Sequence, residues 1–119
     1  MKKTLVLGAT DNPTRFAYLA LHKLLRFGHE VVPVSLKKGE VAGMPILSKD
    51  DAVTDVDTVT LYVGTNNLTY WFDYIIGLNP RRIIFNPGTE NQELENLAKE
   101  KGIQTIHNCT LVMLSVGSY

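Results

Sequence analysis

The residues best suited to bind a charged ligand form a short loop near the start of the chain, residues 8–15, with the sequence GATDNPTR. It lies between an expected strand and an expected helix, so free backbone N–H groups and the positive end of the helix dipole would face an anion there. Gly8 permits a tight turn, and small Ala9 and Thr10 let the backbone approach a ligand closely. Arg15 adds a charged donor for a phosphate oxygen. Of the dinucleotide motif G-x-G-x-x-G only the first glycine is present. The loop predicts a phosphate site, and a strand-to-helix turn without a ligand is the alternative.

A second candidate site follows the next expected strand. NAD-binding domains place a carboxylate at the end of that strand, where it holds the ribose diol. This chain has Val34 and Ser35 there, followed after one residue by Lys37 and Lys38. The missing carboxylate argues against NAD, and the ammonium groups favour a nucleotide with an extra phosphate on its ribose. NADP, with a 2′-phosphate, and coenzyme A, with a 3′-phosphate, both qualify; solvated lysines on a surface loop are the alternative without a ligand.

No side-chain constellation in the sequence predicts a reaction. His107 is expected at the ligand end of a strand, two residues before the single cysteine, Cys109. A Cys–His pair can activate a thiolate, but a free cysteine is more often a small buried hydrophobe, and no third group that would orient the histidine is evident. The other histidines, His22 and His29, are expected to be solvated. Paired carboxylates, a metal-ligand cluster and a P-loop lysine are also missing from the sequence. We therefore expect no catalytic residues and no metal site.

Alternating strand and helix patterns position these loops. Short apolar runs rich in β-branched residues predict strands at 4–7, 30–34, 58–63, 82–85 and 103–106, with a weaker extended segment at 44–47. A helix is expected over residues 13–27, with Asn12 as its N-cap. Its apolar face would comprise Phe16, Leu19, Ala20, Leu24 and Phe27.

Two further helices and a helical tail complete the pattern. Leu68, Trp71, Phe72, Ile75 and Ile76 have the spacing of an amphipathic helix that ends at Gly77. Thr89 and Gln92 have the spacing of a capping box for a helix that ends at Gly102. The apolar tail, residues 109–119, is expected to fold back as a short helical turn.

Strands that alternate with helices predict parallel β-α-β units with right-handed crossovers. The expected fold class is α/β: a three-layer, doubly wound, Rossmann-like parallel sheet in a single domain spanning residues 1–119. We expect the strand order 3-2-1-4-5, with the weak 44–47 strand at one edge. Ligands bind such sheets beyond the carboxyl ends of the strands, where the order reverses. That rule brings the loops 8–12, 35–38, 64–67, 86–88 and 107–109 around one crevice.

The composition is that of an ordinary soluble globular protein, with 45% hydrophobic and 20% charged residues. Twelve basic and 12 acidic residues balance to a formal net charge of zero, which gives no reason to expect a nucleic acid or a membrane as partner. The apolar run at the N-terminus is too short for a signal peptide or a membrane span. With a single cysteine there is no disulfide framework, so we expect a cytoplasmic protein.

Several segments, taken together, carry a family resemblance. They are LVLGATDNP at 5–13, GHEVVPV at 28–34, GMPI at 43–46, VDTV at 56–59, NPG at 86–88 and NC at 108–109. This pattern resembles the stand-alone CoA-binding proteins of bacteria, which are similar to the CoA-binding domain of the succinyl-CoA synthetase α subunit. The chain departs from the pattern at Leu36, where the family usually has a proline, and at Thr110-Leu111, after the final cysteine.

The resemblance implies roles for specific residues. The CoA pyrophosphate would be held by Gly8, Ala9, Thr10, Asn12 and Arg15. The adenosine and its 3′-phosphate would be surrounded by Val34, Ser35 and Lys37 or Lys38. The pantetheine arm would pass Tyr62, Val63 and Gly64.

The sequence therefore favours a binding module for CoA or an acyl-CoA, a small nucleotide-type ligand, without evident catalytic machinery. An NADP-binding oxidoreductase or redox-sensing Rossmann domain is the alternative. A third possibility is a degenerate fold kept for partner binding, with Tyr70, Trp71 and Tyr74 on a helix exposed at an interface. Whether such a partner would be a second copy or another protein is left open.

Overall fold

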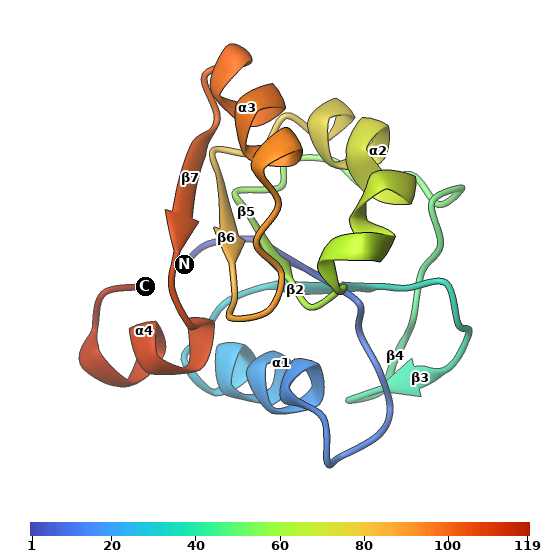
Figure 1. The fold of residues 1–119 in the computed structure, drawn as a ribbon. Coiled ribbons are helices and arrows are strands. Elements are labelled where there is room, and N and C mark those ends of the chain that lie inside the picture. The colour runs from blue at the N-terminus through green and yellow to red at the C-terminus, as the bar shows by residue number, and fades with distance from the viewer.

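A five-stranded parallel sheet forms the centre of the computed structural model, which describes all residues from 1 to 119 (Figure 1). The strands are β1 (Thr4–Leu7), β2 (Val31–Val34), β5 (Thr58–Leu61), β6 (Arg82–Phe85) and β7 (Gln104–His107), in the order β2-β1-β5-β6-β7. Neighbouring strands are parallel throughout, and Thr4 lies opposite both Val31 and Thr58. The chain thus builds outward from β1 first to one side and then to the other, so the strand order reverses between β1 and β5.

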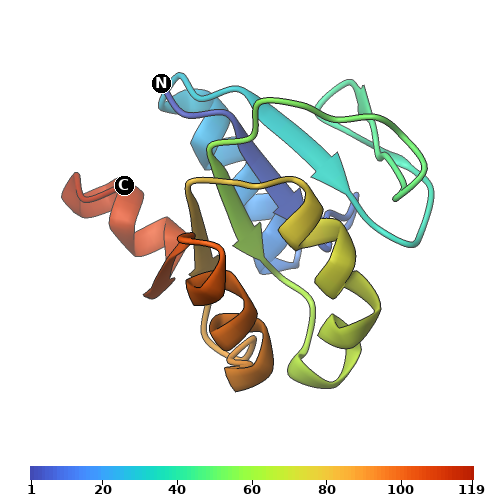
Figure 2. The same ribbon diagram turned by 90° about the horizontal axis from the view of Figure 1, so that it is seen from above.

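Helices cover both faces of this sheet, as Figure 2 shows. On one face lie α1 (Phe16–Arg26) and α4 (Thr110–Val116), and on the other η1, a 3₁₀ segment (Thr65–Trp71), α2 (Phe72–Gly77) and α3 (Gln92–Glu100). Because side chains alternate along a strand, Leu5 and Leu7 pack under α2 and α3 while Val6 packs against α1 and α4. Every residue of β1, β5 and β6 is buried, as expected for strands covered on both faces. These layers confirm the predicted doubly wound, Rossmann-like α/β fold in one domain.

The first helix begins later than predicted. Asn12 is not its N-cap: Asn12 Oδ1 accepts hydrogen bonds from Thr14 N at 3.0 Å and Thr14 Oγ1 at 2.7 Å, which closes a separate turn. The helix starts only after Arg15. The loop that precedes α1 is therefore longer than the sequence pattern suggested, and residues 13–15 belong to this loop and not to the helix.

The apolar face predicted for this helix was also wrong in part. Phe16, Leu19 and Phe27 are 69%, 44% and 52% exposed. The buried face consists of Ala17, Ala20, Leu21 and Leu24. Two alanines and two leucines of α1 thus pack against the sheet, whereas Phe16, Leu19 and Phe27 lie outside this contact. No helix in the structure is long and apolar enough to span a membrane.

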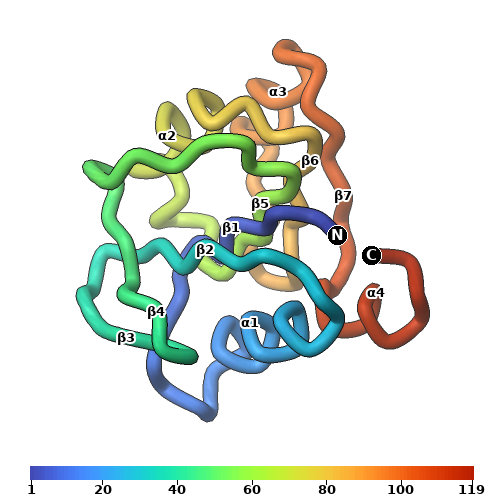
Figure 3. Tube along the Cα trace, turned by 180° about the vertical axis from the view of Figure 1, so that it is seen from behind, coloured from blue at the N-terminus to red at the C-terminus, as the bar shows by residue number.

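The weak strand expected at 44–47 does not form an edge strand of the main sheet. Instead β3 (Glu40–Val41) and β4 (Met44–Pro45) pair antiparallel in a small hairpin, and only Leu47 bridges to Val34 of β2. Ala42 and Gly43 have φ of 53° and 78°, the pair of positive values that a two-residue hairpin turn requires. Figure 3 shows the hairpin beside the carboxyl end of β2, where it shapes the loop between β2 and β3.

Two local predictions at the C-terminal end had different outcomes. The tail does form a helix, α4. The capping box at Thr89 and Gln92 does not form, because Asn91 is the N-cap of α3 and its side chain accepts from Leu94 N at 2.9 Å. Thr89 Oγ1 donates instead to Asn86 O at 2.8 Å, which holds the loop after β6.

Candidate functional site

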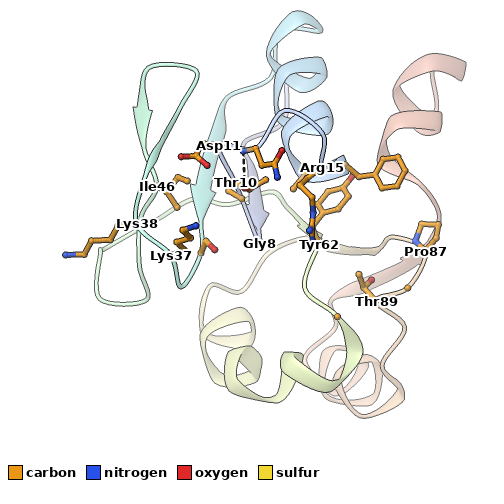
Figure 4. Close-up of a pocket in the computed structure, with 17 residues that line it drawn as sticks. Gly8, Thr10, Asp11, Arg15, Lys37, Lys38, Ile46, Tyr62, Pro87 and Thr89 are labelled. Atoms are coloured by element: carbon orange, nitrogen blue, oxygen red, sulfur yellow. Dashed lines mark hydrogen bonds between the residues drawn. The ribbon is translucent and has the colours of Figure 1, made fainter.

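A cavity of about 590 Å³ lies beyond the carboxyl ends of β1, β2 and β5, at the point where the strand order reverses. Residues of the β1–α1, β2–β3, β5–η1 and β6–α3 loops line it. Figure 4 shows Lys37 and Lys38 at one end of the cavity and Pro87 and Thr89 at the other. This is the crevice that the predicted fold placed at the same edge of the sheet.

The turn after β1 is fixed by the neighbouring strands. Gly8 N and Ala9 N both donate to Val34 O, at 2.9 and 3.1 Å. Gly8 has φ of +94°, and a methyl group added there would lie 2.7 Å from Tyr62 O. Only glycine allows the turn to pass this close to the end of β5.

The N–H groups that remain free in this loop come later than Gly8 and Ala9. Thr10 N and Asp11 N have no acceptor within the protein, and neither have the first N–H groups of α1, at Phe16 and Ala17. They lie beside the cavity, since all four residues line it. Unpaired backbone donors together with the positive end of a helix form an arrangement that binds anions.

Charged side chains make the cavity locally cationic. Arg15, Lys37 and Lys38 line it, against a single carboxylate, Asp11, so three cations and one anion leave a local formal charge of +2. The ion pairs of the protein lie elsewhere, at Lys3, Arg81, Lys99 and His107. In a chain with a formal net charge of zero, this concentration of unpaired cations favours a polyanionic ligand.

Most residues predicted to bind a ligand are brought together here. Lining the cavity are Gly8, Ala9, Thr10, Asn12, Arg15, Ser35, Lys37, Lys38, Tyr62 and Gly64. Val34 is fully buried in β2 and contributes its carbonyl to the turn, and Val63 lines a neighbouring pocket. The lining residues without a predicted role are Asp11, Phe16, Ala17, Ile46, Pro87, Gly88 and Thr89. Of these, Asp11, Pro87 and Gly88 lie in loops expected at the crevice, whereas the loop 107–109, also expected there, does not line the cavity.

The neighbouring pocket, of about 360 Å³, shares Ser35 with the main cavity. It is lined by exposed Leu36 and Tyr70 and by the side-chain amides of Asn66 and Asn67. A lining that combines apolar, aromatic and amide side chains suits a flat polar ring system.

Of the three aromatic residues expected at an interface, only Tyr70 is exposed. Trp71 is 2% exposed and belongs to the core, and the hydroxyl of Tyr74 is buried. The surface expected for partner binding is therefore not formed as predicted.

At the other end of the cavity, a buried amide ties three elements together. Asn86 Nδ2 donates to Thr60 Oγ1 at 2.7 Å and Leu61 O at 2.8 Å, and Asn86 Oδ1 accepts from Thr110 N at 2.9 Å. Next to this network, the Tyr62 hydroxyl is buried without a partner. Burial raises the pKa of Tyr62 above its ordinary value, so the group stays protonated and can donate but not act as a base.

His107 and Cys109, which lie close together in the sequence, are not hydrogen-bonded to each other in the structure. His107 Nε2 lies 3.1 Å from Glu95 Oε1, and its ring stacks on Phe85 with centroids 5.0 Å apart. The hydrogen bond from His107 holds the pKa of Glu95 below its ordinary value. Cys109 is half-buried at the N-cap of α4. His107 therefore serves the contact between β7 and α3.

The remaining histidines are not solvated as expected. His29 Nδ1 accepts from Lys2 N at 2.9 Å, its ring packs against Tyr119, and burial lowers its pKa. His22 packs against Tyr18 with ring centroids 4.3 Å apart, and its Nε2 is buried. No cluster of His, Cys, Asp or Glu side chains in the structure could hold a metal ion.

Comparisons with known proteins agree with this geometry. A family model described as a CoA binding domain matches residues 2–115. A crystal structure of an uncharacterized protein is 52% identical over 100% of this chain and 98% of its own, with a TM-score of 0.97.

More distant structures share the fold. A Thermus thermophilus protein, cell-free ID.343, is 25% identical over 99% of this chain and 90% of its own, with a TM-score of 0.87. A hypothetical protein from Pyrococcus horikoshii OT3 is 26% identical over 97% of this chain and 82% of its own, with a TM-score of 0.88. No curated protein sequence matches significantly.

Proposed function

The chain belongs to the CoA binding domain family, and from this premise we propose that it binds coenzyme A or an acyl-CoA in the cavity at the switch point of its sheet. The observation that carries the proposal is the cavity itself, which combines free backbone donors at a helix start with three unpaired cationic side chains. CoA presents two separate anionic groups, a pyrophosphate and a 3′-phosphate. A site with cations at two places suits such a ligand better than a single phosphate.

The proposed pose places each part of the ligand by its chemistry. The pyrophosphate lies on the N–H groups of Thr10 and Asp11 and at the start of α1, with Arg15 as its charged partner. The 3′-phosphate lies at Lys37 and Lys38. The adenine occupies the neighbouring pocket, and the pantetheine arm runs past Tyr62 toward the loop after β6.

We propose a binding role without catalysis. Two polar groups at this end of the cavity support it: the Tyr62 hydroxyl is protonated, with its pKa raised further by burial, and Asn86 uses its amide within the fold. His107 is tied to Glu95. None of these groups is poised as a base or a nucleophile toward the cavity.

Isothermal titration with CoA and with dephospho-CoA tests the proposal. A hydrogen bond to a charged group contributes about 1.5–3 kcal/mol, so loss of the 3′-phosphate should weaken binding by about tenfold or more. Lys37→Ala and Lys38→Ala should reduce this difference. Lys101→Ala, which removes an exposed lysine outside the cavity, is the matched control.

The same titration separates CoA from NADP, the alternative raised by the two lysines. NADPH binding can be followed by its own fluorescence. Tighter binding of NADPH than of CoA would contradict the proposal in favour of an NADP-dependent protein, and equal binding of CoA and dephospho-CoA would contradict the assignment of the lysines.

A further inference from the structure

One carboxylate, Asp11, lies in the otherwise cationic cavity. Its side chain extends from the tip of the β1–α1 loop to the loop after β2: a methyl group added at Gly39 would lie 3.3 Å from Asp11 Oδ2 and 3.8 Å from Asp11 Cγ. Figure 4 shows Asp11 directed toward the side of the cavity that holds Lys37 and Ile46. The Asp11 carboxylate therefore lies next to the space that a side chain at position 39 would occupy.

Asp11 has no partner within the protein. Its carboxylate is exposed, accepts no hydrogen bond and forms no ion pair, although Lys37 and Lys38 belong to the loop that it touches. A lone carboxylate between two candidate phosphate positions opposes the binding of a polyanion unless it contacts the ligand favourably. The ligand proposed above offers donors for such a contact, since its ribose carries a hydroxyl beside the phosphate.

The position of Asp11 matches a known chemical role. In NAD-binding Rossmann domains, a carboxylate at the end of the second strand accepts hydrogen bonds from the ribose diol. The residues after β2 in this chain, SLKKG at 35–39, contain no carboxylate. Asp11 brings a carboxylate from the opposite loop to the loop after β2, beside Gly39.

We propose that Asp11 accepts a hydrogen bond from the ribose 2′-hydroxyl of the bound nucleotide and thereby selects a 3′-phosphorylated over a 2′-phosphorylated ribose. This inference rests on the proposed binding of CoA. Lys37 and Lys38 attract either phosphate, whereas Asp11 accepts from a free 2′-hydroxyl and repels a 2′-phosphate. The two lysines therefore favour any ribose that carries an extra phosphate, and Asp11 favours the ribose in which that phosphate is at the 3′ position.

Isothermal titration of the wild-type chain, Asp11→Ala and Asp11→Asn with CoA, 2′-deoxy-CoA and NADPH tests this role. We expect wild-type protein to bind CoA about tenfold more tightly than 2′-deoxy-CoA, the size of one hydrogen bond to a charged acceptor. Asp11→Ala should bind the two equally and should bind NADPH more tightly than wild type does. Asp11→Asn keeps a neutral acceptor, so its preference for CoA over 2′-deoxy-CoA should lie between those of wild type and Asp11→Ala.

Asp50→Asn is the matched control, because Asp50 is an exposed carboxylate that lines neither pocket. It changes the net charge equally and should leave all three affinities unaltered. A CoA to 2′-deoxy-CoA ratio that is the same in wild type and Asp11→Ala would overturn the inference, because Asp11 would then act only by repulsion. Failure of wild-type protein to bind CoA at all would overturn the proposed function and this inference together. The two failures are therefore distinguishable.

Discussion

Replacing Gly8 by alanine tests whether the close approach between the turn after β1 and the carboxyl end of β5 limits which residue can occupy position 8. Gly8 N donates to Val34 O, and Gly8 has φ of +94°. An added methyl group would lie 2.7 Å from Tyr62 O and 2.9 Å from Tyr62 C, both backbone atoms of the residue that follows β5. Neither atom can move without shifting β5.

The cost has two separable parts. A left-handed conformation costs a non-glycine residue about 1–2 kcal/mol. Forcing a methyl group into a packed region typically costs about 1–3 kcal/mol more. Gly8→Ala should therefore lower the free energy of unfolding by about 2–5 kcal/mol, a large share of the roughly 5–15 kcal/mol expected for a domain.

Gly28→Ala isolates the first part. Gly28 follows α1 with φ of +85°, but a methyl group added there meets nothing within 4 Å. This variant should lose only about 1–2 kcal/mol, from the backbone conformation alone. Both losses can be measured by urea unfolding followed by far-UV circular dichroism, provided that the urea dependence stays the same in all three proteins.

Equal losses in the two variants would mean that the contact with Tyr62 carries no cost, contrary to the expectation. A Gly8→Ala protein that unfolds like wild type would contradict both parts of the expected cost. If the reasoning holds, Gly8→Ala should also bind CoA more weakly at temperatures where it is still folded, since the turn that presents Thr10 N and Asp11 N would be displaced.

Two further predictions concern contacts outside the ligand cavity. Asn86→Ala should lower the free energy of unfolding by about 3 kcal/mol in the same urea assay, because it leaves buried partners on β5 and α4 unsatisfied. Asn96→Ala, on the exposed face of α3, should change it by less than about 0.5 kcal/mol, and a similar loss in both would contradict a structural role for Asn86. Glu95 has a pKa held below its ordinary value of 4.5 by His107, so its contribution to stability is fully present above pH 4.5 and is lost as the pH falls through the lowered pKa. Glu95→Gln should therefore flatten the decline in thermal stability below pH 4.5, and an unchanged decline would exclude this pair as its cause.

The sequence predicts the parts of this fold that depend on local patterns. The apolar runs of β1, β5 and β6 were recognisable because every residue in them is buried, and the glycine turn because it follows β1 directly. The cationic residues after β2 do line the cavity, and their role in binding stays a prediction. What failed were boundaries decided by local side-chain hydrogen bonds, such as the turn in which Asn12 accepts from Thr14 before α1 begins.

Contacts between segments that are far apart in the chain could not be predicted from the sequence. Asp11 and Gly39 are separated by 28 positions, and only the folded chain brings the carboxylate of one against the backbone of the other. No group that would orient His107 was evident in the sequence, and residue spacing did not indicate that Glu95 would form a hydrogen bond with it. The apolar tail gave no sign that Tyr119 would pack over Arg82, with 4.4 Å between the guanidinium carbon and the ring centroid.

The site divides into a base that is hydrogen-bonded within the fold and exposed tips. At the base, Gly8 and Ala9 are bonded to the last carbonyl of β2 and packed beneath β5, so this geometry belongs to the fold itself. At the tips, Asp11, Lys37 and Lys38 are exposed and bonded to nothing in the protein. A substitution at the base should change stability, whereas a substitution at the tips should change only which nucleotide binds. Ligand identity in this fold then depends on a few surface side chains, which is why the sheet by itself does not separate CoA from NADP and the charges around it can.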